Sequence, residues 1–527
     1  FIVLDGDATL LALEDDVRSE LAKVGVNVST RLLAKDPFNA EMVAGNFNLA
    51  FSETWGPPYD PHSYAASWNT PDEAYYAALR GLPEPYTQSA LSTMIDEVLT
   101  RETELAREEG WRKILGVLHS QATELPFSGK RIPAVINNRL SGYQRGAQQF
   151  DYPMHTLRVD SGSRNITVSP GGQTGLFAGI GRLDPHSYRP NEFFANNWVY
   201  EGLVDYGSEG AIIPSLATSW TVADISGGGQ RYTFNLRQGV TFHDGAPWNC
   251  SVAKLNFDNV LAPPLTTADW HGWYNLPKQI NSWNCSSTYV FEITTRDKYY
   301  PLLQELTYIR PLRMLSPTMF VGQYANDPLT QNSCPTGWGS ATNDGITVTC
   351  AGILGISGTG RWEYITSITD ANGDVSEVIF KRNENHWDTT TTGAVVEFMR
   401  LIRYQNSSSV KAALLSTELD MVIGEGVLAP ADVEEFRINR TASFHVILTE
   451  SFQNRIIIFN TAKSPTNELQ VRKTMIHAVN KAAIIDSELA GLADPVDQLF
   501  PRNAPYCNID LTPRWDYDSE KANLLNC

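Results

Sequence analysis

The first 53 residues alternate between short apolar runs and amphipathic stretches, and no other feature constrains the fold of this chain as strongly. Residues 1–4 predict a strand, and Asp7 can cap a helix whose apolar residues recur at steps of three and four until a glycine ends it. Further strands are predicted at 26–33 and 48–51, with a helix over 36–43 between them. Two consecutive βαβ units predict an α/β sheet.

The character of the sequence changes twice further along the chain. Residues 129–449 contain short strand-like runs separated by Gly, Asn and Ser, with fewer helices, of which 251–261 is among the clearest. An apolar strand at 455–459 and a long helix at 468–480 then restore the α/β pattern. We therefore expect the first and last segments to form one domain around a β-rich middle.

Composition excludes several classes of protein. The 527 residues are 42% hydrophobic and 19% charged, which is ordinary for a globular protein. The net charge is −18 and no basic stripe interleaved with aromatic residues occurs, so a nucleic-acid partner is not expected. No apolar run approaches the roughly 18 to 20 residues of a membrane-spanning helix. The chain starts at Phe1 without a methionine or a signal-like region, which indicates a processed product or a fragment.

Six cysteines occur as three pairs of neighbours along the chain. An even number without CxxC spacing favours disulfide bonds in an oxidising compartment over zinc binding, although the sequence leaves other pairings open. The predicted pairs are Cys250–Cys285, Cys334–Cys350 and Cys507–Cys527. N-glycosylation is permitted rather than indicated, because a chain so rich in Asn, Ser and Thr contains such sequons by chance. The sequons are at Asn27, Asn165, Asn249, Asn284, Asn406 and Asn439.

The stretch TWGPPYDPH at 54–62 is the clearest candidate for a ligand-binding loop. Its three prolines and one glycine prevent a helix or a strand ladder directly after the predicted strand at 48–51. Trp55 and Tyr59 should therefore stand on a stiff loop beyond the carboxyl end of a strand, where ligands lie in open α/β sheets. The alternative is a turn whose two rings only fill the core.

Four stretches together resemble the solute-binding proteins of the peptide, opine and nickel class of ABC importers, known as family 5. They are VYEGLVDYG (199–207), IIPSLATSW (212–220), FNLRQGVTFHDGAPW (234–248) and VRKTMIHAVNK (471–481). The similarity is closest to the nickel-binding members, and it includes LDPHSYRPNEFFA (183–195), YYPLLQEL (299–306), RNENHW (382–387), FNTAKSPTNELQVR (459–472) and the 54–62 stretch. The resemblance implies a two-lobed, periplasmic-binding-protein-like α/β fold with one large lobe. It also implies an extracytoplasmic location and the membrane subunits of an ABC importer as partners.

The order of the segments departs from the family. The nickel-binding pattern would begin near Asn165, and the part that resembles its final third is 1–155, placed in front. The chain is therefore circularly permuted relative to the family, or it is one unit cut from a tandem array. Mapped on the family, lobe I, the large β-rich lobe, is 129–454, and lobe II is assembled from 455–527 followed by 1–128.

The resemblance also implies a site between the lobes. Aromatic rings sandwich a metal chelate in the nickel-binding members, and the matching positions here are Trp55 and Tyr59 from one lobe and Trp273 from the other. Arg310 matches the arginine that binds a ligand carboxylate in the family. Its guanidinium can bind a carboxylate through two parallel hydrogen bonds. The alternative for Arg310 is a structural salt bridge.

Three lining positions differ from the family pattern. Glu73 replaces a metal-ligating histidine, Trp270 replaces a second arginine, and Phe193 replaces a methionine. Loss of the imidazole puts specific nickel binding in doubt, since carboxylate is a harder ligand. None of the nine histidines has HxH or HExxH spacing, so no metal site is predicted beyond a weak candidate at His271, and no cofactor beyond a bound metal chelate.

Two classes of function fit these features. The chain has no GxSxG elbow, Walker loop or GxGxxG after a strand, so it is not expected to be an enzyme. The first hypothesis is an extracytoplasmic binding protein that closes on a metal chelate, a carboxylate-bearing small molecule or a short peptide. The alternative is a structural subunit of an extracellular assembly, a homopolymer that reuses the fold without transport.

Overall fold

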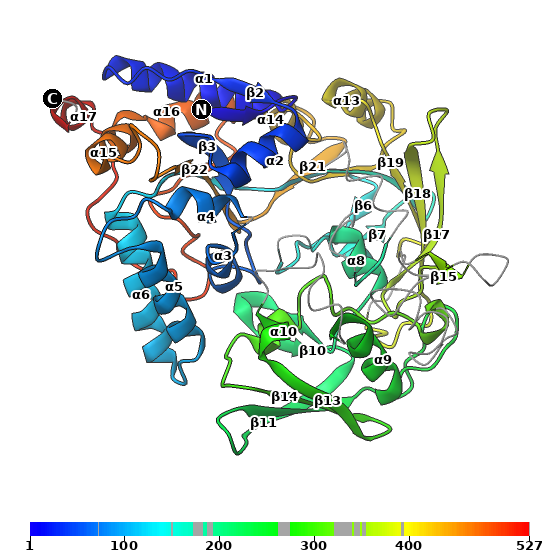
Figure 1. Ribbon diagram of the computed structural model, residues 1–527. Coiled ribbons are helices and arrows are strands. Elements are labelled where there is room, and N and C mark those ends of the chain that lie inside the picture. Colours follow the sequence, from blue (N-terminus) through cyan, green and yellow to red (C-terminus); the bar gives the residue numbers. More distant parts are fainter. Residues whose placement is uncertain are drawn as a thin grey trace.

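The computed structural model describes most of the chain, and its secondary structure is mixed α/β (Figure 1). The described residues are 1–71, 73–148, 151–171, 183–186, 193–261, 275–320, 340–341, 348–349, 355–390 and 395–525. Among them, no helix has the length and apolar character needed to cross a membrane.

Three large sheets organise the molecule. The six-stranded sheet has the order β2 (Arg31–Leu33), β1 (Ile2–Leu4), β3 (Leu49–Glu53), β22 (Gln453–Phe459), β4 (Glu124–Lys130), β23 (Asp494–Pro495). The seven-stranded sheet has the order β17 (Trp362–Thr369), β18 (Val375–Arg382), β19 (Phe398–Ile402), β8 (Asn165–Pro170), β20 (Met421–Ile423), β5 (Pro133–Asn137), β21 (Phe444–Leu448). The four-stranded sheet has the order β11 (Ala217–Asp224), β12 (Gln230–Leu236), β14 (Val290–Thr295), β13 (Ile280–Ser287). Two-stranded pairs are β9 (Val204–Tyr206) with β10 (Ile212–Pro214), β6 (Leu140–Ser141) with β7 (Arg158–Val159), and β15 (Ser340–Ala341) with β16 (Val348–Thr349).

The helices cover these sheets. Those in the first 120 residues are α1 (Ala8–Lys23), α2 (Lys35–Ala44), α3 (His62–Ser67), α4 (Ala74–Leu79), α5 (Gln88–Leu99) and α6 (Glu104–Ser120). The middle of the chain contributes α8 (Phe193–Val199), α9 (Cys250–Leu261), α10 (Leu276–Gln279), α11 (Leu302–Glu305), α13 (Ser407–Leu415) and α14 (Pro430–Asn439). The last are α15 (Leu469–Ala478), α16 (Lys481–Glu488) and α17 (Ser519–Leu525). Short 3-10 turns lie at Met154–Thr156, Ser208–Gly210 and Pro317–Met319.

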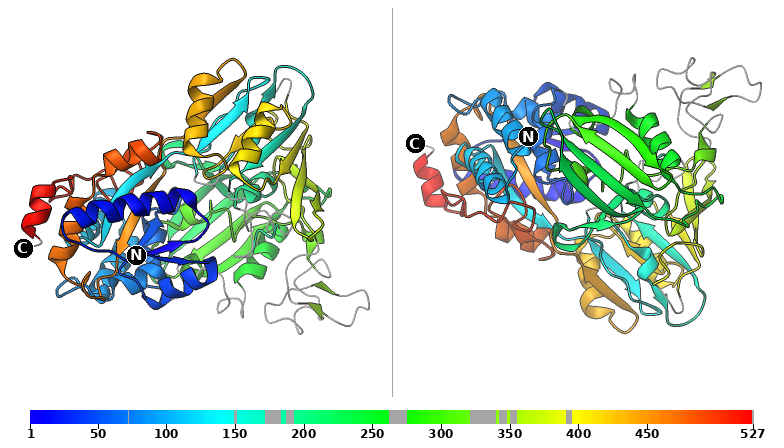
Figure 2. Two further views of the ribbon diagram at one scale, coloured as in Figure 1. Left: turned by 90° about the horizontal axis from the view of Figure 1, so that it is seen from above. Right: turned by 90° about the horizontal axis from the view of Figure 1, so that it is seen from below.

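The six-stranded sheet is built from both ends of the chain. β22 lies between β3 and β4 and pairs antiparallel with each of them. Segments near the N-terminus (blue) and the C-terminus (orange) therefore lie side by side, as both views of Figure 2 show. Alternate residues of β22 face opposite sides, so that Ile456 and Ile458 pack against α4, α5 and α6 while Ile457 and Phe459 pack against α1, α15 and α16. We call this sheet and its helices the six-stranded lobe.

The seven-stranded sheet, with α13 and α14 on one face and α8 on the other, forms the second layered unit, which we call the seven-stranded lobe. Val135, Val422 and Phe444 face α13 and α14, whereas Ile136 and Met421 face the opposite core. The chain passes between the two lobes at β4 to β5 and at β21 to β22. The four-stranded sheet shares one continuous hydrophobic cluster with α4, α5 and α6.

The two-lobed α/β fold expected from the sequence is confirmed, and the differences are local. The strand predicted at 26–33 is only β2, because the ladder with β1 begins at Arg31; before it, the Ser29 carbonyl accepts a single hydrogen bond from the Phe1 amino group at 2.9 Å. One of the short apolar runs of the middle of the chain, at 240–242, forms a turn rather than a strand, with the Phe242 N–H donating to the Ala246 carbonyl.

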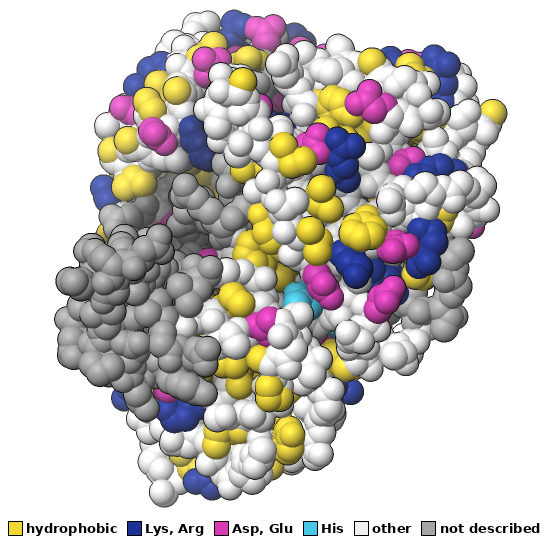
Figure 3. Space-filling model, turned by 90° about the vertical axis from the view of Figure 1, so that its right-hand side faces the viewer, with side chains coloured by type: hydrophobic (Ala, Val, Ile, Leu, Met, Phe, Trp, Pro, Cys, Tyr) yellow, Lys and Arg dark blue, Asp and Glu magenta, His cyan; other side chains and the backbone are white. Residues whose placement is uncertain are grey.

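The outer side of the seven-stranded lobe carries charges of both signs. Figure 3 looks onto this side and shows Lys and Arg side chains among Asp and Glu, with hydrophobic side chains between them. Arg400 of β19 forms an ion pair with Glu377 of β18, and Arg361, which directly precedes β17, forms one with Asp388. The surface there is electrostatically mixed rather than of one sign.

The cysteines behave differently from one another. The predicted Cys250–Cys285 disulfide is present. The prediction for Cys507 is wrong, since it is a buried free thiol whose Sγ donates to the Pro505 carbonyl. Cys507 packs on the α5 and α6 side of the six-stranded sheet, whereas Trp515 and α17 pack on the opposite side with α15. The last helix therefore lies on the other face of the sheet from Cys507. Cys334, Cys350 and Cys527 lie outside the described residues.

Candidate functional site

The Trp55 loop follows β3, as the sequence predicts, and Asp60 holds its shape. The Asp60 carboxylate accepts hydrogen bonds from the backbone N–H groups of Trp55 at 3.1 Å and Gly56 at 2.8 Å. Burial raises the pKa of Asp60 to about 7, against the opposing effect of these bonds. Gly56 has a φ of +72°, a left-handed conformation that favours glycine at this turn.

Tyr59 lies against the segment that contains Arg310. Its ring packs on that of Tyr308 with 4.3 Å between centroids, and Trp55 lies edge-on to Tyr59 at 6.5 Å. Gln304 Nε2 donates to the Pro58 carbonyl at 2.5 Å. Tyr59 is buried while Trp55 is partly exposed. Tyr59 is therefore also part of the hydrophobic core, as expected from the alternative that the rings of this turn fill the core.

A buried polar network continues this contact. His62 Nε2 lies 2.9 Å from the Tyr308 hydroxyl and 3.6 Å from Glu305 Oε1. Ser63 Oγ lies 2.5 Å from the same hydroxyl. We call the group of Tyr59, His62, Ser63, Glu305 and Tyr308 the loop contact. The sequence alone gives no sign of this contact, because a single sequence does not reveal a partner 246 positions away.

Arg310 is buried, with 5% of its surface exposed, and α8 supports its neighbour. Asn196 of α8 donates to the Ile309 carbonyl at 3.0 Å. Arg313 donates to the carbonyls of Tyr308 at 3.0 Å and Thr307 at 2.7 Å. The backbone directly before Arg310 is therefore held by hydrogen bonds from the side chains of Asn196 and Arg313.

The structure describes the other predicted site residues only in part. Glu73 precedes α4 and is partly exposed. Phe193 begins α8, but its side chain is not described. Trp270, His271 and Trp273 lie outside the described residues. Within the described ranges, no group of three or more His, Cys, Asp or Glu side chains is placed to hold a metal ion.

Four charged residues link the lobes where the strands cross. Lys130 Nζ lies 2.6 Å from both Glu53 and Glu425, and Arg455 lies 2.6 Å from Glu425 and 3.7 Å from Glu53. Burial raises the pKa of Glu425, but the charges of Lys130 and Arg455 outweigh burial and bring it down to about 2. Glu425 follows β20 of the seven-stranded lobe, and the other three belong to the six-stranded lobe. We call these four residues the crossover cluster.

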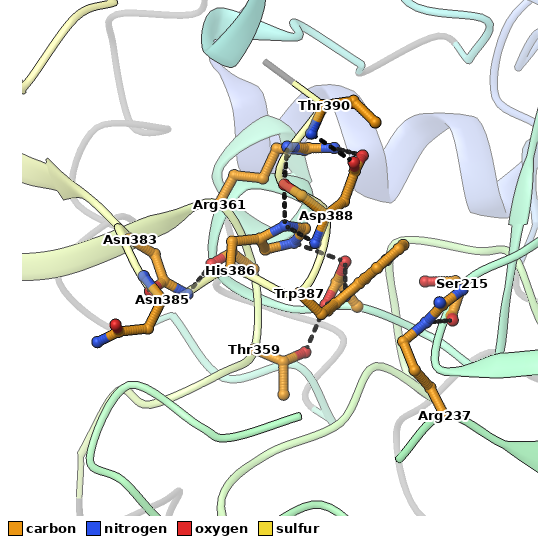
Figure 4. Close-up of polar contacts among 12 residues, drawn as sticks. Ser215, Arg237, Thr359, Arg361, Asn383, Asn385, His386, Trp387, Asp388 and Thr390 are labelled. Atoms are coloured by element: carbon orange, nitrogen blue, oxygen red, sulfur yellow. Dashed lines mark hydrogen bonds and ion pairs between the residues drawn. The ribbon is translucent and has the colours of Figure 1, made fainter. Parts of the chain in front are cut away.

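A second polar network lies within the middle of the chain (Figure 4). Glu201 accepts hydrogen bonds from Thr359 Oγ1 at 2.7 Å, His386 Nε2 at 3.1 Å and Trp387 Nε1 at 3.0 Å. The Arg237 guanidinium lies 3.7 Å from the centroid of the Trp387 ring. Two of the stretches that carry the resemblance, 199–207 and 382–387, therefore meet in one network, which the sequence alone did not connect.

Comparisons with known proteins agree with this architecture. The chain is 33% identical over 346 residues to a nickel-binding periplasmic protein of Escherichia coli K12, covering 66% of this chain and 58% of the relative. It is 25% identical over 335 residues to the glutathione-binding protein GsiB of Pectobacterium atrosepticum, covering 62% of this chain and 54% of the relative. The chain thus spans less than two thirds of these curated relatives.

A solved structure gives the same result. The crystal structure of NikA from Brucella suis in complex with Fe(III)-EDTA matches with a TM-score of 0.53 and 29% identity, covering 68% of this chain and 63% of that one. Two α/β lobes joined by crossing strands define a two-lobed binding-protein fold. The model of the bacterial extracellular solute-binding proteins, family 5, matches residues 211–525, and the chain belongs to this family. The relatives are named as binding proteins and not as enzymes.

Proposed function

We propose that this protein closes its two lobes on a small ligand that carries a carboxylate: a metal chelate, another small molecule or a short peptide. The supporting observation is the packing of Tyr59 on Tyr308, since it brings the Trp55 loop of the six-stranded lobe beside the arginine segment from the middle of the chain. The names of the relatives, which specify nickel, glutathione and Fe(III)-EDTA, support a ligand of this size. Binding rather than catalysis is the proposed activity.

In this proposal each site residue has a role. Trp55, Tyr59 and Trp273 supply flat rings around the ligand, and Arg310 forks its carboxylate. Trp270 and Phe193 add apolar wall. Glu73 places negative charge at the rim, which disfavours polyanionic chelates and tolerates a ligand with an amine. The site has no specificity for nickel, and His271 remains the only proposed metal contact.

The chain order is also part of the proposal. We infer that the chain is circularly permuted relative to the family, with lobe boundaries near 128/129 and 454/455. The position of β22 between β3 and β4 supports this, because it makes one sheet from 1–130 and 453–495. Extracytoplasmic location and partnership with ABC importer membrane subunits follow from the family and are proposals for this chain.

Titration calorimetry with glutathione, Fe(III)-EDTA and free nickel tests the function. Glutathione should bind more tightly than Fe(III)-EDTA, and free nickel only weakly. Arg310→Ala should weaken binding by about 2 to 5 kcal/mol, because the carboxylate then faces an apolar wall. Arg310→Lys should recover part of the loss, since an ammonium keeps the charge without the fork.

Arg400→Ala is the matched control, because Arg400 forms a surface ion pair on β19. Glu73→His should strengthen binding of Fe(III)-EDTA relative to glutathione. Tight binding that Arg310→Ala leaves unchanged would show that the wrong residues have been assigned. No binding of any probe, together with a polymeric native size, would favour the assembly-subunit hypothesis.

A further inference from the structure

The last described segment of the chain, residues 513–525, lies against the six-stranded lobe and ends in α17 (Figure 1). We call it the terminal strap. Trp515 of the strap is 2% exposed and belongs to the same hydrophobic cluster as α15 and α17. Two histidines from other elements reach the strap, His119 from the last turn of α6 and His477 from the last turn of α15. Titratable side chains from two helices therefore hold this segment.

Both imidazoles donate to backbone carbonyls of the strap and lie beside its tryptophan. His119 Nε2 donates to the Pro513 carbonyl at 2.6 Å, and His477 Nδ1 donates to the Asp516 carbonyl at 2.7 Å. The ring centroids of His119 and His477 lie 5.0 and 5.5 Å from that of Trp515. We call His119, His477 and Trp515 the histidine clasp.

The carbonyl contacts decide which nitrogen of each ring carries a proton. A carbonyl only accepts, so His119 must be protonated at Nε2 and His477 at Nδ1. Both rings are buried, and His477 Nε2 has no hydrogen-bond partner among the described residues. A second proton on His477 would therefore place a charged N–H where nothing accepts its hydrogen bond. The clasp favours neutral rings.

Charged side chains of both signs act on the two rings. They are Asp497 and Lys481 around His119, and Asp516, Asp518 and Lys521 around His477. Burial is the largest effect on each ring, and it lowers the pKa of each imidazole. Because the folded-state pKa lies below the unfolded value of about 6.5, the neutral rings stabilise the strap fully above about pH 6.5. This stabilisation is lost as pH falls from there through the folded-state pKa.

The chain before the strap is held by contacts of a different kind. Asn454 Nδ2 donates to the carbonyls of Gln498 and Leu499, each at 3.0 Å. Gln498 Nε2 donates to the Cys507 carbonyl at 2.7 Å. Side-chain amides and backbone carbonyls do not titrate near neutral pH, so mild acid leaves these hydrogen bonds unchanged. Loss of the clasp should therefore free the terminal strap while 498–507 stays in place.

We propose that the histidine clasp is a pH-dependent latch, which holds the terminal strap on the six-stranded lobe while both rings are neutral and releases it when they are protonated. Release removes Trp515 and Ala522 from the apolar cluster that they share with Met475 and Ile476 of α15. In acid the lobe thus presents an apolar surface that is covered at neutral pH. The proposal is independent of the ligand, since no residue of the proposed ligand site takes part.

Hydrogen–deuterium exchange of the full chain at about pH 7.5 and about pH 5 tests the latch. After correction for intrinsic exchange rates, the strap amides should exchange at least about tenfold faster at the lower pH, because the released state binds more protons. The Asp518 and Ala522 N–H groups, which donate to the carbonyls of His477 and Asp518 at 2.9 Å, report release directly. The amides of β22 should keep their protection, which distinguishes release of the strap from unfolding of the lobe.

His119→Gln and His477→Asn each keep a donor in place of the bonded nitrogen but cannot be protonated. The double variant should hold the strap in acid as it does at neutral pH, and each single variant should remove part of the pH response. His445→Asn is the matched control, because His445 contacts Asn138 on β21 of the other lobe. It should leave release unchanged. Equal strap exchange at both pH values, release that the double variant retains, or a parallel loss of protection in β22 would each overturn the latch.

Discussion

Two contacts that join the six-stranded lobe to the middle of the chain are built from different chemistry. The crossover cluster joins them with charges: two cations and two carboxylates, with 2.6 Å contacts across the crossing strands. The loop contact joins them with packed rings and hydrogen bonds centred on Tyr308. Charged pairs have narrow distance requirements, whereas rings slide over one another at small energetic cost. We therefore expect the crossover cluster to contribute more to holding these parts together, and the loop contact to be the more adaptable of the two.

The largest change in the free energy of unfolding is expected from pH. A change of pH affects the crossover cluster and the Trp55 loop in opposite directions. The folded-state pKa of Glu425 is about 2, below its unfolded value, so its stabilisation is present above about pH 4.5 and is lost as pH falls through 2. The folded-state pKa of Asp60, beside the loop contact, is raised to about 7, so its contribution is complete below about pH 3.8 and is lost as pH rises through 7.

Urea unfolding between pH 2 and 8 measures both contributions. Glu425→Gln should flatten the acidic limb of the stability curve, and Asp60→Asn should flatten the limb between pH 4 and 7. If either variant changes the limb assigned to the other, the two regions are not independent.

The next largest change in the free energy of unfolding is expected from Glu425→Gln at neutral pH. Lys130 is left with Glu53 alone, and the nearest carboxylate to Arg455 is then at 3.7 Å. We expect a loss of about 2 to 3 kcal/mol in the free energy of unfolding, less than for a fully buried pair because the Glu425 side chain is 39% exposed. Small-angle scattering should also show a broader distribution of lobe arrangements. Unchanged scattering and stability would show that the cluster does not hold the lobes.

A smaller effect is expected from Tyr308→Phe. The change removes the hydroxyl beside His62 and Ser63 but keeps the ring under Tyr59. Because His62 and Ser63 are buried, we expect a loss of about 1 to 2 kcal/mol in urea unfolding. A loss as large as that of Glu425→Gln would contradict the view that the loop contact is the more adaptable of the two places.

The smallest effect is expected at the surface, where Glu435 pairs with Lys411 and Arg440. Glu435→Gln should change the free energy of unfolding by no more than about 0.5 kcal/mol, since exposed ion pairs contribute little. Measured at the same pH as Glu425→Gln, it separates the loss of a carboxylate from the loss of the crossover cluster.

The sequence by itself determined the class of fold and most of its elements. Periodicity placed β22, α9 and α15 to within about two residues, because apolar spacing follows directly from which face of an element is buried. The same argument placed Trp55 and Tyr59 on a loop after a strand. The similarity of several stretches to family 5 then assigned the two-lobed arrangement.

Only the tertiary structure decided which distant residues meet. Glu425 with Lys130 and His62 with Tyr308 are far apart in the chain, and a single sequence carries no signal for such pairs. The Cys507 prediction was wrong for the same reason, since spacing along the chain does not reveal that Cys507 and α17 lie on opposite faces of one sheet. Local periodicity reports burial, but partners are set by how buried faces pack, and that is decided only when the whole chain is folded.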